Sequence, residues 1–91
     1  MDDAELLKAI DKLKSTMISV ATGGPRIAEV QDEFSALFDA VDAELDRRSI
    51  SNALPYRELW DWYGRWSSGD LPSYKSRRTF VNELAGDLVR T

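Results

Sequence analysis

The chain has 91 residues and contains neither cysteine nor histidine. Without cysteine it has no disulfide framework and no thiolate nucleophile. Without histidine it lacks the commonest general base, the usual zinc ligand and the usual activator of a serine nucleophile. Carboxylates, serines and tyrosines remain, but no glycine-rich phosphate loop or nucleophile constellation accompanies them. We therefore predict a protein that is not an enzyme and that needs no metal and no cofactor.

Long apolar runs are also missing. None approaches the roughly 20 residues of a membrane span, and the opening "MDDAELLKAIDKLK" is acidic and evenly charged, unlike a signal peptide. These features predict a cytoplasmic protein with no membrane partner. A chain of this length suffices for one domain. Residues 1–91 are therefore predicted to form a single helical domain, which we interpret as a module of a longer protein.

Charge is distributed unevenly along the chain. The net charge is −4, but residues 1–46 hold eleven acids and four bases, whereas residues 47–91 hold five acids and eight bases. The two parts therefore carry −7 and +3. Opposite charge indicates that the two parts attract each other, either within one fold or between copies of the chain. Self-association and a separate protein partner are both compatible with this pattern.

Two long helices are predicted in the first half. Residues 2–21 place apolar side chains at steps of four and three, which is the spacing of one helical face: Leu6, Ile10, Leu13, Met17 and Val20. The run "TGGP" ends this helix, because glycine permits a left-handed exit and proline fits the first turn of a following helix. Residues 26–48 repeat the apolar spacing through Ile27, Val30, Phe34, Leu37, Val41 and Leu45. The short link predicts an antiparallel hairpin.

Two shorter helices are predicted in the second half. One covers residues 55–66, and the run "SSGDLPS" forms the loop after it. The other begins near Ser73 and carries Tyr74, Val81, Leu84 and Leu88 on one side. The fold class is therefore predicted to be all-α, a four-helix up-and-down bundle in which the two long N-terminal helices form a hairpin.

Three tryptophans lie close together in "LWDWYGRW". At about 100° per residue, one arc of a helix collects residues that we predict to be core: Tyr56, Leu59, Trp60, Tyr63 and Trp66. Trp62 falls at the margin of that arc, where it can be half buried or can anchor an interface. Exposed rings at Trp60 and Tyr63 would instead favour a platform that stacks nucleic-acid bases.

The fourth helix places Arg77 in line with apolar residues. A buried guanidinium needs a carboxylate, an aromatic ring or an anion. One interpretation is that Arg77 stacks on a tryptophan or tyrosine, or pairs with an acid. The other is that Arg77, Lys75 and Arg78 form an anion site at the helix N-terminus. The candidate residues for binding a partner or an anion are Trp62, Arg65, Lys75, Arg77 and Arg78.

The runs "ATGGPRI" and "LWDWYGRWSSGDLPSYKSRR" resemble the N-terminal helical region of uncharacterised bacterial proteins of the abortive-infection, phage-defence type. In that family a second helical domain follows this region, and the resemblance supplies no catalytic residues. It implies a sensing or adaptor role in antiviral defence. The predicted function is a non-catalytic protein–protein interaction module. The alternative is a nucleic-acid or anion-binding module that uses the basic and aromatic corner of the last two helices. An acidic chain with a pI near 4.7 weighs against this alternative.

Overall fold

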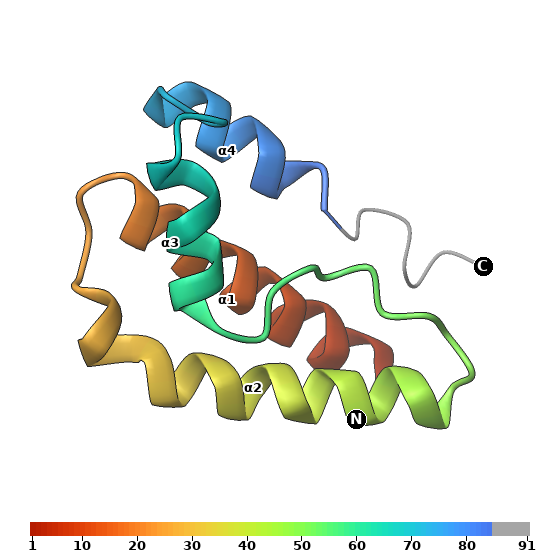
Figure 1. Ribbon diagram of the computed structural model, residues 1–91. Helices are drawn as coiled ribbons and strands as arrows, with labels where there is room; N and C mark the ends of the chain where they lie inside the picture. Colours follow the sequence, from red (N-terminus) through yellow and green to blue (C-terminus); the bar gives the residue numbers. More distant parts are fainter. Residues whose placement is uncertain (85–91) are drawn as a thin grey trace.

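The computed structural model describes residues 1–84 and forms four helices in that range (Figure 1). They are α1 (Asp3–Ala21), α2 (Ile27–Arg47), α3 (Leu59–Ser67) and α4 (Tyr74–Asn82). No strand occurs among these residues, so the all-α prediction is confirmed, whereas the up-and-down bundle stays a prediction. Leu88, predicted on the inner side of the last helix, lies outside the described residues. None of the four helices combines the length and the apolar character that crossing a membrane requires.

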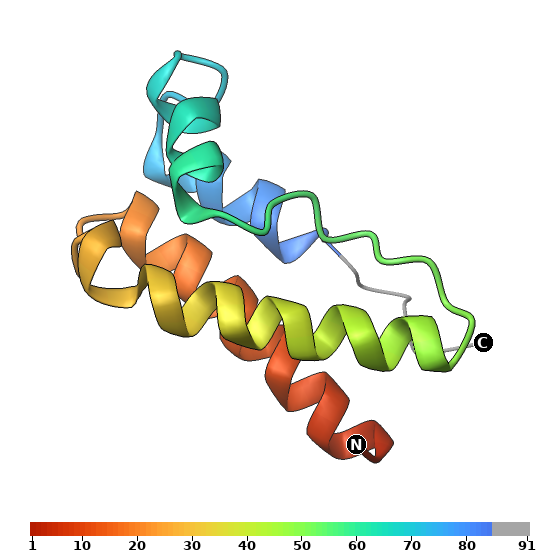
Figure 2. The same ribbon diagram turned by 60° about the horizontal axis from the view of Figure 1, so that its bottom comes forward.

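The helices form two layers. α1 and α2 pack on each other, and α3 and α4 lie on one side of that pair (Figures 1 and 2). α3 contacts both long helices, and α4 contacts α1. The connector of residues 48–58 runs back over α2 and brings the chain to the start of α3 (Figure 2). The opposite side of the α1–α2 layer has no helix of residues 1–84 packed on it.

The periodicity of the two long helices identified their inner faces. All five apolar residues predicted for the inner face of α1 are buried. On α2, Phe34, Val41 and Leu45 are buried, but Val30 and Leu37 are only partly buried. The apolar arc of α2 is thus wider than the surface its neighbours cover. α1 begins as its sequence predicts, because the Asp2 carboxylate accepts the Glu5 amide at 2.8 Å and caps the helix.

Both long helices end in the same kind of turn. After α1, Gly23 adopts a positive φ of 86° and the Gly24 amide donates to the Ser19 carbonyl at 2.7 Å. After α2, Ser49 adopts φ 59° and the Ile50 amide donates to the Leu45 carbonyl at 2.9 Å. Each is a left-handed C-terminal cap, a position that favours glycine. The left-handed position is therefore occupied by serine after α2 and by glycine after α1.

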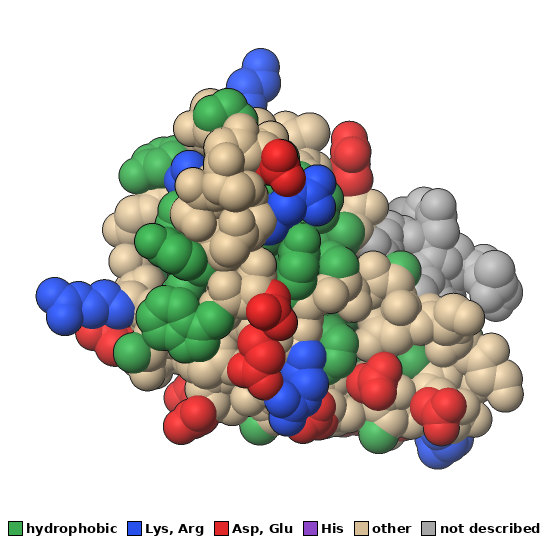
Figure 3. Space-filling view, in the orientation of Figure 1, with side chains coloured by type: hydrophobic (Ala, Val, Ile, Leu, Met, Phe, Trp, Pro, Cys, Tyr) green, Lys and Arg blue, Asp and Glu red, His purple; other side chains and the backbone are tan. Residues whose placement is uncertain are grey.

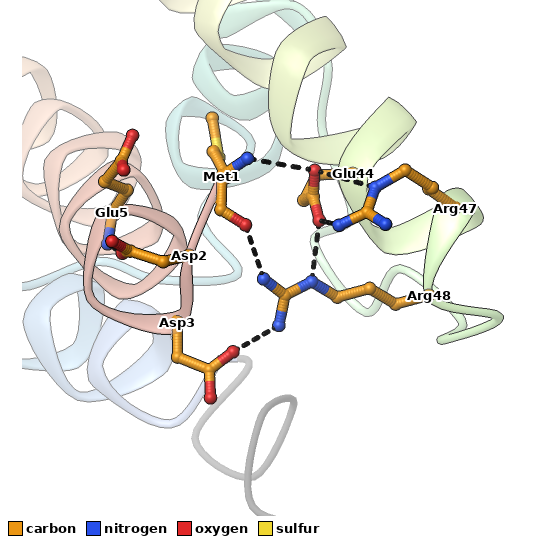
Figure 4. Close-up of polar contacts among 7 residues, drawn as sticks. All are labelled: Met1, Asp2, Asp3, Glu5, Glu44, Arg47 and Arg48. Atoms are coloured by element: carbon orange, nitrogen blue, oxygen red, sulfur yellow. Dashed lines mark hydrogen bonds and ion pairs between the residues drawn. The ribbon is translucent and has the colours of Figure 1, made fainter.

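A polar cluster joins the start of α1 to the end of α2 (Figure 4). Glu44 is buried, and its carboxylate accepts hydrogen bonds from Arg47 and Arg48 and lies 3.5 Å from the Met1 ammonium group. Arg48 also donates to Asp3 and to the Met1 carbonyl. The Arg47 guanidinium, followed by that of Arg48, lowers the pKa of the Glu44 carboxyl to about 2. The buried carboxylate therefore stays charged and tethers the two helix ends.

The prediction for the third helix is wrong in its start and in its face. α3 begins at Leu59, so Tyr56 belongs to the connector. Leu59 and Trp62 are fully buried, whereas Trp60 is 55% exposed and Tyr63 is 43% exposed. The apolar residues of α3 span an arc of about 160°, which is more than one short helix buries against two neighbours. The fold buries the end of that arc that holds Trp62.

A hydrogen bond explains why Trp62 is the buried ring. Its indole Nε1 donates to the Met17 carbonyl of α1 at 2.9 Å. A buried indole N–H without an acceptor is costly, so this acceptor makes full burial favourable. The ring also stacks on Phe80 of α4, with centroids 5.5 Å apart and planes 15° apart. Trp62 is therefore the residue where α1, α3 and α4 meet.

Candidate functional site

The main candidate site is a surface groove between α3 and the α1–α2 turn. It has a volume of about 340 Å³. We call it the aromatic groove and define it by its lining residues: Val20, Pro25, Arg26, Ile27, Ala28, Trp60, Tyr63 and Trp66. Figure 3 shows hydrophobic side chains gathered over α3 and the α1–α2 turn, with basic side chains at the edge of that region.

The aromatic wall is built by helical spacing. Trp60, Tyr63 and Trp66 follow one another at steps of three along α3 and pack edge to face. The Trp60 and Tyr63 centroids are 6.1 Å apart with planes at 73°, and those of Tyr63 and Trp66 are 4.9 Å apart with planes at 75°. This arrangement is the one that aromatic pairs prefer, and it fixes the rings relative to one another. The wall is therefore preformed.

Arg77 supports the aromatic wall from behind. Its guanidinium carbon lies 4.3 Å from the Trp66 ring centroid and 5.5 Å from that of Tyr74. Its Nε donates to the Leu71 carbonyl at 2.9 Å and its Nη1 to the Ala21 carbonyl at 2.7 Å. Ala21 ends α1, where helix carbonyls lack partners and the dipole favours a cation. The interpretation that Arg77 stacks on an aromatic ring is confirmed.

The other predicted site residues do not gather at one place. Arg65 faces the opposite side of α3, where its Nε lies 3.1 Å from the Asp70 carboxylate and its guanidinium lies 5.0 Å from the Phe80 centroid. A hydrogen bond with the Tyr56 hydroxyl raises the pKa of Arg65. Lys75 and Arg78 are exposed on α4. Their predicted roles in binding a partner or an anion stay predictions.

Trp62 requires a correction. It was predicted at the margin of the apolar arc, available as an interface anchor, but it is 0% exposed. A ring in the core cannot contact a partner while the domain is folded. The exposed rings are instead those of Trp60 and Tyr63, and their predicted place in the core is wrong. The width of the apolar arc on α3 was the signal that the residues at one of its ends would remain exposed to solvent.

The second wall of the aromatic groove was not predicted from the sequence, although its residues belong to the run "ATGGPRI". The sequence predicts a helix break at "TGGP" and a helix from Arg26, yet Pro25, Arg26 and Ile27 together line the groove. Arg26 is exposed and forms no ion pair with any residue in the range 1–84. The groove therefore presents apolar walls and one exposed cation.

The described lining of the groove is mainly apolar and aromatic. Its lining contains no carboxylate, hydroxyl nucleophile or metal ligand besides the Tyr63 phenol. Among residues 1–84, no group of three acidic, histidine or cysteine side chains is arranged to hold a metal ion. Tryptophan, tyrosine and arginine are the residue types most enriched where proteins bind one another. Comparison with known protein families, curated proteins and solved structures finds no match.

Proposed function

We propose that this chain is a non-catalytic protein-interaction module whose aromatic groove binds an extended peptide segment of a partner protein. The observation that carries the proposal is the exposure of Trp60 and Tyr63, 55% and 43%, on a preformed concave wall. Leaving two such rings in water forgoes a large gain from burial. Apolar surface of this kind, rimmed by polar groups, is typical of interaction sites.

The chemistry of the groove defines the partner segment. Val20, Ile27 and Ala28 face the aromatic wall, so a proline or an aliphatic side chain is the group that fits between them. Arg26 lies at the groove and forms no ion pair within residues 1–84, and guanidinium groups bind carboxylates through paired hydrogen bonds. We therefore expect a proline or aliphatic residue next to an aspartate or glutamate in the bound segment.

A base-stacking platform is the second candidate, and the exposure of Trp60 and Tyr63 favours it. Stacking successive bases requires open ring faces and a track of cations along the backbone. Here neighbouring rings stand at 73° and 75° to each other, and the guanidinium of Arg77 covers a face of Trp66. The net charge of −4 opposes phosphate binding as well. These features support a peptide over a nucleic acid.

The same proposal includes the biological process in which the module acts and the compartment in which it lies. The resemblance of "ATGGPRI" and "LWDWYGRWSSGDLPSYKSRR" to bacterial abortive-infection proteins supports a sensing or adaptor role in antiviral defence, inside the cytoplasm. Both runs contribute residues to the aromatic groove, namely Pro25 and Ile27 from the first and Trp60 and Tyr63 from the second. The partner would then be another protein of such a system.

Selection from a random peptide library tests the proposal. We expect the wild-type protein to enrich peptides with a proline or aliphatic residue beside an acidic residue. By calorimetry, Trp60→Ala should weaken binding of an enriched peptide about 30-fold, or about 2 kcal/mol, because an aromatic anchor is lost. Arg26→Ala should weaken it about tenfold, as expected for a charge-assisted contact. Lys8→Ala removes an exposed cation outside the groove and is the control, which should bind like the wild type.

A parallel titration with a fluorescent oligothymidine tests the second candidate. The proposal is overturned if no peptide is enriched, or if enriched peptides bind Trp60→Ala as tightly as the wild type. Salt-dependent binding of the oligonucleotide that Trp60→Ala abolishes would establish the base-stacking platform instead.

A further inference from the structure

A second groove lies between α1 and α2, away from the aromatic groove. It has a volume of about 530 Å³. We call it the hairpin groove and define it by its lining residues: Lys12, Leu13, Thr16, Val30, Glu33, Phe34, Ala36, Leu37 and Ala40. Its floor is apolar, and its two banks belong to α1 and α2. It is larger than the aromatic groove and plays no part in the proposed function.

The hairpin groove faces away from α3 and α4. On α2, Gln31 accepts the Leu59 amide of α3 at 2.8 Å. Glu33, which lines the groove, lies two residues further along and thus about 200° around the helix. On α1, Lys14 donates to the Asn82 carbonyl of α4 at 3.2 Å, and Lys12 lines the groove. The groove therefore lies on the side of the α1–α2 layer opposite α3 and α4. Figure 2 shows α3 and α4 together on the other side of that layer.

The groove is suited to a close helical contact. Val30 and Leu37 continue the core periodicity of α2 but remain partly exposed. Ala36 and Ala40 are exposed beside them, one helical turn apart, and have side chains short enough to let another helix approach. Because the described elements cover one side of a two-helix layer, the other side retains apolar surface that a further layer would bury.

The two sides of the hairpin groove carry opposite charges. Lys12 stands on the α1 bank and Glu33 on the α2 bank of the same groove. We infer that a second copy of this chain docks here, related by a two-fold axis that runs along the groove. This axis stacks α1 of one copy on α2 of the other and sets Lys12 opposite Glu33 twice. A two-fold interface must be self-complementary, and opposite charges on its two banks satisfy that requirement.

The area of the exposed face of the α1–α2 layer sets the expected affinity of the dimer. The helices have 19 and 21 residues, so each is about 30 Å long. With axes about 9 Å apart, the layer presents a face of about 600 Å² per copy, or about 1,200 Å² in total. This area is at the lower end for stable complexes, so the dimer should dissociate in the micromolar range. Each copy would retain its own aromatic groove.

Sedimentation velocity on the full chain, from low micromolar to near millimolar concentration, tests the inference. We expect a reversible monomer–dimer equilibrium. Lys12→Glu and Glu33→Lys should each raise the dissociation constant at least about tenfold, because each sets like charges opposite each other twice. The double variant should restore dimerisation to within a few-fold of the wild type. Lys75→Glu changes the same charge on α4, outside the groove, and should have no such effect.

Circular dichroism on each variant verifies that the helices remain. A monomer at every concentration, or a dimer indifferent to both single charge reversals, would overturn the inference. So would loss of the dimer in Trp60→Ala, because the aromatic groove would then be the contact between copies. Peptide binding by Lys12→Glu stays a separate measurement, so failure of the dimer and failure of the proposed function are distinguishable.

Discussion

α2 and α3 both present a wide apolar arc, but α2 displays it over 21 residues and α3 over nine. On α2 the centre of the arc is defined by buried residues spread along several turns, namely Phe34, Val41 and Leu45. On α3 there are barely two and a half turns. The same pattern is therefore consistent with two inward faces on α3, one through Trp60 and one through Trp62. The length of a helix, rather than its hydrophobicity, therefore determined how reliably the apolar pattern predicted its buried face.

Trp60 and Trp62 give the sharpest form of this comparison. They are two residues apart on the same helix, with the same side chain, and are 55% and 0% exposed. Trp62 has an acceptor for its indole N–H in the core, and Trp60 lines the aromatic groove. One ring holds the fold together and the other is available to a partner.

The largest expected effect separates these two tryptophans. Trp62→Ala should lower the free energy of unfolding by about 3–5 kcal/mol, because it leaves a cavity and removes a buried hydrogen bond. Trp60→Ala should change it by less than about 0.5 kcal/mol, as for other surface substitutions. Urea denaturation followed by circular dichroism measures both. If Trp60→Ala lowered the free energy of unfolding as much as Trp62→Ala, or more, Trp60 would be part of the core, as the sequence predicts.

A medium effect is expected at Arg77, which joins the two layers. Arg77→Ala should lower the free energy of unfolding by about 2 kcal/mol, because two backbone carbonyls lose a charged donor and Trp66 loses its stacked guanidinium. Arg78→Ala, next to it and exposed, should have an effect below about 0.5 kcal/mol. Urea denaturation of the two variants provides the comparison. Unchanged stability in Arg77→Ala combined with loss of phosphate binding would support the anion site instead.

The smallest effect compares the ends of the two long helices. Ser49→Gly should raise the free energy of unfolding by about 0.5–1 kcal/mol, because glycine adopts the left-handed conformation without a steric penalty. Gly23→Ala should lower it by a similar amount for the same reason. Thermal unfolding of both variants measures the two shifts. A loss of stability in Ser49→Gly would mean that the Ser49 side chain contributes more than its backbone conformation costs.

Local signals in the sequence determined where the helices begin and end. Asp2 caps α1, "TGGP" separates α1 from α2, and Ser73 starts α4 with its hydroxyl accepting the Ser76 amide at 3.0 Å. In these cases the capping group and its partner lie within a few residues of each other. The side chain therefore needs no tertiary contact to reach its partner. The start of α3 was placed too early because a proline at a first helical turn and a proline in a connector are the same local signal.

Only the tertiary structure decided which aromatic residues form the core and which form the candidate site. The acceptor for Trp62 is the Met17 carbonyl, 45 residues away along the chain, and one of the two acceptors for Arg77 is the Ala21 carbonyl, 56 residues away. Both carbonyls belong to α1, so their availability depends on how α1 packs against α3 and α4. The sequence by itself determined an all-α chain with two long amphipathic helices and more aromatic surface than a small core holds. Packing against α1 then decided which groups were buried, because α1 supplies acceptors for the Trp62 indole and the Arg77 guanidinium. A buried polar group without a partner is costly.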